Sequence, residues 1–442
     1  MLKLHQPGGP DAPSFEELSA CVRCGMCLEA CPTYHELKVE MDSPRGRLKL
    51  MRGLVEGAIE PTPSVLEHLD RCLDCRACES ACPSTVHYGQ ILEKTRTVLQ
   101  PLRAVSWADR FWRWFALDVV LRSRLVQRLV FKLVWLSQRL GLVSLGQWLG
   151  RRKLLPRAVS DALAQNAPVP LFSFRERHAS ALDRNRNVLV FPAKGERRKR
   201  VALLTGCVAD QLFADVNEAS VRVLTENGCD VEVAALERCC GALHIHNGAR
   251  DDAKALARDN VGLFHLDDYD AIVSNAAGCS AELRHYGELL PGDPQAQAFA
   301  AKVRDISEFL CEIGLRAPPS TAAVGRVAYD EPCHLLHAQK ISDPPKQILA
   351  AIAGVTLVPL EDADVCCGGA GIYFLLQPDL SQKIAARKVE AIRRSGAEIV
   401  ATGNPGCLLQ LRSALGAAGL SVRVVHPIEL LAGAYTLHGR LL

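Results

Sequence analysis

The chain has 442 residues and the composition of an ordinary globular protein, with 48% hydrophobic and 23% charged residues. This length allows roughly two to four domains, each with a core of its own. A net charge of +3 is too small to favour nucleic acid as a partner. The first residues lack the basic and then apolar pattern of a secretory signal, so we expect a cytoplasmic protein. Its 18 cysteines then indicate metal or redox sites rather than disulfide bonds.

Eight of these cysteines form two copies of the pattern C-x2-C-x2-C-x3-C-P, and each member of the second copy lies 51 positions after its counterpart. In bacterial ferredoxins this spacing gives three thiolates to one 4Fe–4S cluster and the fourth to the neighbouring cluster. A pair of zinc sites is the alternative, but tetrahedral zinc explains neither the third cysteine nor the repeated Cys-Pro ending. We therefore predict two 4Fe–4S clusters. Cluster 1 would be held by Cys21, Cys24, Cys27 and Cys82, and cluster 2 by Cys72, Cys75, Cys78 and Cys31.

The residues between the two cysteine runs have the pattern of helices. Apolar residues in the segments 46–51 and 65–69 are spaced as in a helix rather than a strand. Ser43 and Pro44 precede the first segment and are typical of a helix start, because proline is tolerated in the first turn. We expect a helical ferredoxin-like domain over residues 1–100.

The remaining cysteines form a second, longer repeat. Four cysteines recur after 126 to 128 positions in the form C-x31–32-C-C-G-x37–38-C. The first copy contains Cys207, Cys239, Cys240 and Cys279, and the second contains Cys333, Cys366, Cys367 and Cys407. Because the offsets between the four pairs of matching cysteines differ by at most two positions, the pattern indicates a tandem duplication. Cys229 and Cys311 lie outside both patterns, and we expect them to be ordinary buried thiols.

Each copy alternates short apolar runs with helical segments, as α/β domains do. Strands are predicted at 201–205, 231–233 and 271–274 in the first copy and at 327–329, 356–358 and 398–402 in the second. Because ligand sites gather at the carboxyl ends of such strands, the four cysteines of each copy are expected to converge on one site. The predicted fold class is α + α/β, a helical ferredoxin-like domain followed by two duplicated α/β cysteine-rich domains at 196–320 and 321–442.

The segment 101–153 holds all five tryptophans and eleven Lys or Arg residues against two acidic ones, a local charge of +9. Its apolar residues recur at helical spacing, but no run reaches the ~20 apolar residues needed to cross a bilayer. A basic, tryptophan-rich helix suits the surface of an anionic membrane, so we expect peripheral membrane contact through 104–149. Packing of this helix against its own domains or a partner is the open alternative. The domain division assigns 101–195 to this helical segment and a linker that follows it.

Motifs of nucleotide-binding and hydrolytic enzymes are absent from the sequence. The glycine-rich run 366–371 lacks the phosphate-loop lysine and is interpreted as a cysteine-bearing turn. Histidines near the repeat cysteines could tune or ligate a metal, although lone histidines are more often hydrogen-bonded structural residues; they are His244, His246, His334 and His337. With no flavin or nicotinamide site visible, we expect a chain that relays electrons, has no catalytic residue of its own and depends on a partner.

Several segments resemble the iron–sulfur subunit of bacterial glycolate oxidase. They are 21–27 (CVRCGMC), 42–47 (DSPRGR), 68–76 (HLDRCLDCR), 204–207 (LTGC), 239–241 (CCG), 333–340 (CHLLHAQK) and 366–371 (CCGGAG). The resemblance implies that FAD-containing subunits oxidise glycolate to glyoxylate and pass the electrons to this chain. It also implies that the electrons reach a membrane acceptor such as quinone, with the complex at the cytoplasmic face of the inner membrane.

The duplicated copies resemble the cysteine-rich CCG domains of heterodisulfide reductase, which hold unusual iron–sulfur clusters. In those domains the last cysteine belongs to a C-x-x-C pair, but this chain has Ala276 and Asn404 at the first position of the pair. Four thiolates per copy suffice for a further 4Fe–4S cluster or another metal, and the resemblance leaves open whether either copy holds one. Iron–sulfur subunits of anaerobic glycerol-3-phosphate and lactate dehydrogenase complexes are the alternative functions. A non-catalytic redox sensor or cluster scaffold is a further alternative.

Overall fold

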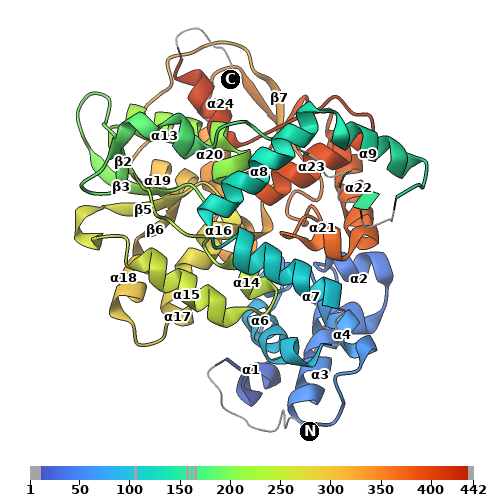
Figure 1. Cartoon of the computed structure of the whole chain (residues 1–442). Helices are drawn as coiled ribbons and strands as arrows, with labels where there is room; N and C mark the ends of the chain where they lie inside the picture. The colour runs from blue at the N-terminus through green and yellow to red at the C-terminus, as the bar shows by residue number, and fades with distance from the viewer. Residues whose placement is uncertain (1–10, 104–106, 156–158, 161–162, 164–166, 437–442) are drawn as a thin grey trace.

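The computed structural model describes residues 11–103, 107–155, 159–160, 163 and 167–436, which form a helical N-terminal part and two sheets (Figure 1). All elements within residues 11–103 are helical. They are α1 (Phe15–Ser19), α2 (Pro32–Leu37), η1 (Glu40–Asp42), α3 (Pro44–Val55), α4 (Pro63–Asp70), α5 (Ala77–Ser80), α6 (Tyr88–Leu99) and η2 (Gln100–Leu102). The predicted fold class, helical ferredoxin-like and then α/β, is confirmed.

Helix α3 begins at the predicted position. The side chain of Ser43 accepts a hydrogen bond of 3.0 Å from the backbone N–H of Gly46, and Pro44 takes the first helical position. A Cβ atom at Gly46 would lie 1.9 Å from a backbone oxygen of the preceding turn, so this position requires glycine. Met51 on α3 and Leu92 on α6 are fully buried in the core that the two helices share.

The first sheet has six strands in the order β1-β2-β4-β3-β5-β6. They are β1 (Leu182–Asp183), β2 (Val188–Phe191), β3 (Lys199–Leu204), β4 (Cys229–Ala234), β5 (Ala271–Ser274) and β6 (Val303–Asp305). The last four are parallel, whereas β2 pairs antiparallel with β4 and β1 with β2. The interpretation of residues up to 195 as linker is therefore wrong for 182–191, because backbone hydrogen bonds to β4 draw β2 into the sheet.

The second sheet repeats the parallel part of the first. Its order is β10-β9-β7-β8, with β7 (Gly325–Tyr329), β8 (Val355–Val358), β9 (Ile399–Ala401) and β10 (Arg423–Val425) all parallel. This order corresponds strand by strand to β6-β5-β3-β4 in the first sheet. The tandem duplication that the cysteine spacing predicts is therefore present in the fold.

Helices cover both sheets and join them into one body. Those of the first copy are α12 (Cys207–Leu212), α13 (Ala214–Glu226), α14 (Ala242–His246), α15 (Arg250–Val261), η5 (Leu266–Asp268), α16 (Ala277–Arg284), α17 (Tyr286–Leu289), α18 (Pro294–Lys302) and α19 (Ile306–Glu312). Those of the second are η6 (His334–Ala338), α20 (Asp343–Ala350), α21 (Tyr373–Leu376), α22 (Pro378–Ser395), α23 (Pro405–Ala417) and α24 (Pro427–Ala434). One hydrophobic core contains Leu224 of α13 and Leu431 of α24, both fully buried, so the two copies share a core.

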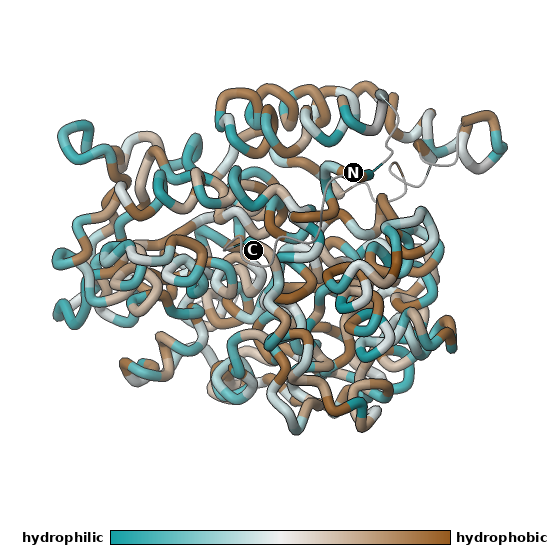
Figure 2. Tube along the Cα trace, turned by 90° about the horizontal axis from the view of Figure 1, so that it is seen from below, coloured by the Kyte–Doolittle hydropathy of each residue, from teal (hydrophilic) through white to brown (hydrophobic). Residues whose placement is uncertain are grey.

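The tryptophan-rich segment forms a helical layer on one side of the molecule, comprising α7 (Trp107–Trp114), η3 (Phe115–Val120), α8 (Arg124–Arg139) and α9 (Leu142–Arg151) (Figure 1). Seen from below, strongly hydrophobic turns of this layer lie at the upper edge of the molecule (Figure 2). Arg124 holds α8 to the first copy, with its guanidinium 3.7 Å from Asp210 and 3.9 Å from Glu237. After the layer come α11 (Phe174–Arg177) and η4 (Ala179–Ala181).

Within the described residues, no single helix is long and apolar enough to cross a membrane. Helices α8 and α9 together have the required length and composition, but they meet at a bend of 74°. The outward face of the layer is apolar, and Leu129 and Leu133 on α8 are 59% and 57% exposed.

His426 joins the two copies and is fixed in its neutral form. Its Nε2–H donates to the backbone oxygen of Asn275 at 2.9 Å, and its Nδ1 accepts from the N–H of Ile428 at 3.1 Å. Burial lowers the pKa of His426 to about 4, although the bond to Asn275 opposes this. A protonated ring would lose the bond from Ile428, because both of its nitrogens would then be donors.

Acidification should therefore weaken the joint between the copies. In the unfolded chain His426 takes up a proton below pH 6.5, whereas in the folded chain it does so only near pH 4. The free energy of unfolding should thus fall by about 2 kcal/mol between pH 7 and pH 5 through this residue alone. Urea unfolding followed by circular dichroism at both pH values measures it, with exposed His87→Gln as the control. An equal pH dependence in His426→Gln and the unaltered chain would contradict the assignment.

Candidate cysteine sites

The two cysteine runs of the N-terminal part fold into loops of the same shape. The third and fifth residues of each run have positive φ angles, 60° at Arg23 and 88° at Gly25 in the first run, and 55° at Asp74 and 59° at Arg76 in the second. This left-handed conformation costs residues with a side chain roughly 1–3 kcal/mol each. Its recurrence at matching positions indicates that the shape of the loop is required, as in a loop that wraps a bound group.

The last cysteine of the first run lies among the first three of the second. One small cavity, of about 20 Å³, is lined by Cys31, Cys72, Cys75 and Cys78. Cys31 reaches it as the N-cap of α2, where the chain leaves its own loop. Burial raises the pKa of Cys78 well above its ordinary value, so ionised sulfur at this position requires a bound cation. These four residues fit the ligand set of a 4Fe–4S cluster.

The other four cysteines of the two runs lie closer to the surface. Cys21, Cys27 and Cys82 pack against the helical core of the N-terminal part, whereas Cys24 is exposed. Burial, together with the neighbouring Cys21 and Cys31, raises the pKa of Cys27 to about 11. All cysteines of the chain are free thiols. Their reduced state and clustering fit a second metal-cluster site, one side of which is open to the outside.

In each repeat copy the cysteines follow the strands. Cys207 begins α12 just after β3, and Cys279 lies in the first turn of α16 after β5. Cys407 has the corresponding place in α23, after β9. Cys333 directly precedes η6, after β7. The two Cys-Cys pairs precede the short helices α14 and α21. The carboxyl ends of the parallel strands therefore bring cysteines from three loops together in each copy.

The thiols of each copy form a chain of contacts. Cys207 donates to the sulfur of Cys239 at 3.4 Å. Further side-chain contacts join Cys239 to Cys240 and Cys240 to Cys279 in the first copy, and Cys333 to Cys366, Cys366 to Cys367 and Cys367 to Cys407 in the second. Four contacting thiols with little exposure are a ligand set that suits iron–sulfur clusters or zinc.

Both sets of four cysteines line the same cavity, which has a volume of about 500 Å³. Cys72 also lines it, so this residue borders both the large cavity and the small one beside Cys31. Leu376, at the end of α21, lines the large cavity and is 60% exposed, so the cavity reaches the surface there. The structure thus places the second cysteine run and both repeat copies around one space.

Ala276 and Asn404, which occupy the positions of the missing cysteines, lie where the two copies touch. The side-chain oxygen of Asn404 accepts from the N–H of Gly278 at 3.1 Å, and its amide group lies 3.6 Å from the sulfur of Cys407. The N–H of Ala277, the residue after Ala276, donates to the backbone oxygen of Gly403 at 3.1 Å. These positions therefore connect the copies across the cavity instead of supplying a fifth thiol.

The four histidines near the repeat cysteines divide into two pairs. His244 bonds the backbone oxygen of Leu117 at 3.0 Å, and His337 bonds Ser80 and the backbone oxygen of Asp364, both at 3.0 Å, so these two are structural. His246 and His334 line the large cavity, with ring centres 5.3 Å apart.

Sequence reasoning missed the carboxylates that His246 contacts. Asp74 and Glu93 come from the second cysteine run and α6, more than 150 residues earlier in the chain. Nothing in the local pattern of either residue indicates the contact.

Comparison with known proteins agrees with this geometry. Residues 17–86 match the 4Fe-4S dicluster domain family, and residues 201–284 and 327–412 match the cysteine-rich domain family. The fold and its cysteine sites define an iron–sulfur electron-transfer subunit of an oxidoreductase complex.

Curated relatives identify the family of the chain more closely than the domain matches do. The chain is 37% identical to the probable glycolate oxidase iron-sulfur subunit of Bacillus subtilis, over 95% of this chain and 94% of that protein. It is 33% identical to the glycolate oxidase iron-sulfur subunit of Escherichia coli, over 90% of each. It is 29% identical to lactate utilization protein A of an Exiguobacterium species, over 52% of this chain and 96% of that protein. The chain belongs to the family of glycolate oxidase iron–sulfur subunits.

Proposed function

We propose that this chain carries electrons from FAD-containing subunits, which oxidise glycolate to glyoxylate, to a membrane acceptor such as quinone. The observation that carries the proposal is the position of Cys72, which borders both the small ferredoxin-like cavity and the large cavity of the repeat copies. The full-length relatives named for glycolate oxidase support the choice of substrate. The chain itself contributes no catalytic residue to the oxidation of glycolate.

The proposed ligands are those that the cysteine spacing predicts. Cluster 2 is assigned to Cys31, Cys72, Cys75 and Cys78, and the cavity that these four line supports this set. Cluster 1 is assigned to Cys21, Cys24, Cys27 and Cys82. Each repeat copy offers four contacting thiols for one further cluster. The functional units are residues 1–100, the helical layer from 101, and two repeat copies, of which the first includes β1 and β2.

When bound, each iron–sulfur cluster accepts and releases single electrons. The positions of the cysteines indicate the order in which electrons would pass through the sites. Cys24 is exposed between Val22 and Met26, which are 70% and 60% exposed, and this apolar surface suits a docking flavoprotein. Cys75 is buried and close enough to Cys333 for their charges to interact. The two belong to one hydrophobic cluster, so the second site adjoins the second repeat copy.

We further propose that the helical layer lies on the anionic surface of the inner membrane. Its apolar side chains face outward, and basic side chains stand beside the tryptophans. Arg152 lies 4.4 Å from the ring centre of Trp148, and Arg139 lies 5.7 Å from that of Trp135. This combination of an apolar face with positive charge is complementary to an anionic lipid surface.

Replacement of Leu129 and Leu133 by glutamine should release the chain from vesicles that contain anionic lipid. Each leucine should contribute about 1.5–3 kcal/mol when it enters the lipid, so the double variant should bind at least ~100-fold more weakly. Sedimentation with vesicles of phosphatidylcholine and phosphatidylglycerol measures binding, and salt should weaken it. Leu357→Gln, at an exposed position on β8, is the matched control. Unchanged binding of the double variant would contradict membrane docking through this face.

The cluster assignment predicts a crossed effect of Cys31→Ser. Because Cys31 lines a cavity with the second run, its loss should damage the cluster held by Cys72, Cys75 and Cys78 and spare the other. Electron paramagnetic resonance of the reduced chain, with Cys229→Ser as a control at a thiol outside both patterns, distinguishes the two signals. Loss confined to the cluster of Cys21, Cys24 and Cys27 would reverse the pairing.

The substrate assignment predicts which donor reduces the chain. Anaerobic addition of glycolate should bleach the visible iron–sulfur absorption of the complex with its flavoprotein subunits. The isolated chain should not bleach, since it has no group that removes hydride from glycolate. Bleaching by lactate or glycerol 3-phosphate but not by glycolate would transfer the chain to the corresponding alternative complex. Turnover of glycolate by the isolated chain would contradict the relay role.

A further inference from the structure

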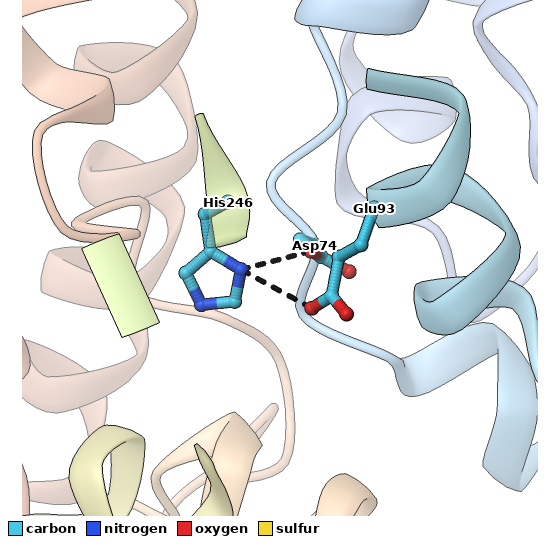
Figure 3. A group of neighbouring side chains, drawn as sticks. All are labelled: Asp74, Glu93 and His246. Atoms are coloured by element: carbon cyan, nitrogen blue, oxygen red, sulfur yellow. Dashed lines mark hydrogen bonds and ion pairs between the residues drawn. The ribbon is translucent and has the colours of Figure 1, made fainter. Parts of the chain in front are cut away.

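Charged side chains are buried together where the N-terminal part meets the first repeat copy. The ligand atoms of Asp74, Glu93 and His246 all lie within 4.8 Å of one another. His246, the last residue of α14, has its Nδ1 at 3.0 Å from a carboxylate oxygen of Asp74 and 3.4 Å from one of Glu93 (Figure 3). The proposed function assigns no role to this group.

The charges in this group balance without a metal ion. Arg76 lies 2.9 Å from the same oxygen of Glu93 that faces His246, and both residues are almost fully buried. Two carboxylates therefore face one guanidinium and one imidazole, and buried charges are stable only when they are paired in this way. The arrangement favours a protonated imidazole in the position where a metal ion would otherwise lie.

The ring of His246 is oriented by these carboxylates. Burial opposes its charge, but hydrogen bonds to Asp74 and Glu93 prevail and raise the pKa of His246 to about 10. Figure 3 shows the other ring nitrogen, Nε2, pointing away from both carboxylates. His246 lines the large cavity, and Nε2 is the ring nitrogen that the contacts with the two carboxylates leave available to a bound molecule.

The large cavity has the properties of a small-molecule site. Its volume of about 500 Å³ lies within the usual range of ligand pockets, and clusters held by the repeat cysteines would occupy the part of it beside their sulfur atoms. Leu243 and Phe374 contribute apolar lining, and His246 contributes a hydrogen-bond donor. The repeat cysteines line the same space, so a cluster bound to them would bring electrons close to this proton donor.

We propose that His246 is the proton donor to a two-electron, two-proton acceptor of the quinone class that enters this cavity, with Asp74 and Glu93 as its positioning residues. The inference rests on the proposed function, because the electrons come from the oxidation of glycolate in the flavoprotein partner. The quinone gains two electrons through the chain. One Nε2–H bond of His246 breaks as an O–H bond forms on the quinone. The oxidation of glycolate to glyoxylate in the partner releases two protons to the solvent. Two solvent protons enter through water at the rim near Leu376, where one completes the quinol and the other reprotonates Nε2 of His246.

The pH dependence of this step has a defined sign. The donor must be protonated, so quinone reduction should slow as pH rises through the pKa of His246. Glu93→Gln removes one of the two carboxylates that stabilise the imidazolium, so the decline should move to lower pH. The other charged or titratable groups that face this cluster are Arg76, Arg96, Glu282, His285 and His334. All five are unchanged in that variant.

The test uses the purified complex with its flavoprotein subunits, glycolate as donor and a water-soluble short-chain quinone as acceptor. His246→Gln should lower kcat by at least ~100-fold, the usual contribution of a positioned acid, with little change in KM. Ferricyanide, which takes one electron and no proton, should be reduced at a similar rate by the variant and the unaltered complex. His265→Gln, at an exposed histidine, is the matched control. Iron content and paramagnetic resonance spectra should be the same in all of these proteins.

Several outcomes would overturn the inference. Quinone turnover by His246→Gln at the unaltered rate would remove His246 as donor, and an unshifted pH profile of Glu93→Gln would remove the positioning role. A metal ion that is bound in the unaltered chain and lost in His246→Gln would make the cluster a metal site instead. Failure of glycolate to reduce the complex would count against the proposed function alone. In that event the chain reduced with dithionite, mixed with quinone after removal of the reductant, still compares His246→Gln with the unaltered protein.

Discussion

The contact of thiol with thiol in the two repeat copies is the constraint on which the rest of this structure depends. Cys207 and Cys239 meet at 3.4 Å among residues with little exposure, and the second copy has the same chain of contacts. Neutral thiols gain little from such packing, and ionised thiols repel one another unless a cation lies between them. The parallel strands and short helices around these thiols therefore hold a cluster of polar sulfur groups where an ordinary protein would have an apolar core.

Buried charged residues lie next to the cysteine turns and are held in ion pairs with one another. In the first copy, Glu237 accepts the N–H of Gly206 at 2.8 Å, and Arg175 binds Glu237 and Asp210 in turn. In the second copy, buried Lys388 lies 2.9 Å from Asp330, which also accepts from Thr402. Both copies thus place a paired cation and carboxylate under the cysteine loops. Removal of one partner would leave an uncompensated buried charge, which explains why each pair is almost fully enclosed.

Much of this architecture can be predicted from the sequence because it is encoded in local spacing. The cysteine repeats predict the duplication, and apolar runs predict β3, β5, β7 and β9 within one or two residues. Strand β2 was missed because its four residues owe their structure to pairing with β4, some forty residues later. The shared cavity was missed for the same reason, since its lining comes from both repeat copies and from Cys72. Contacts between distant segments leave no periodic signal in any one of them.

The ion pair between His246 and Asp74 joins the first repeat copy to the N-terminal part, and its location indicates a role beyond stability. A salt bridge between domains could be built anywhere on their interface, and at the surface it would contribute little. Here Asp74 belongs to a cysteine loop, and its N–H lies 3.4 Å from the sulfur of Cys72. His246 ends a helix that begins just after a Cys-Cys pair. The ion pair therefore connects one proposed cluster site directly to the wall of the cavity beside another. Movement of an electron between those sites would change the field at the imidazole, and this couples the position of the proton to that of the electron.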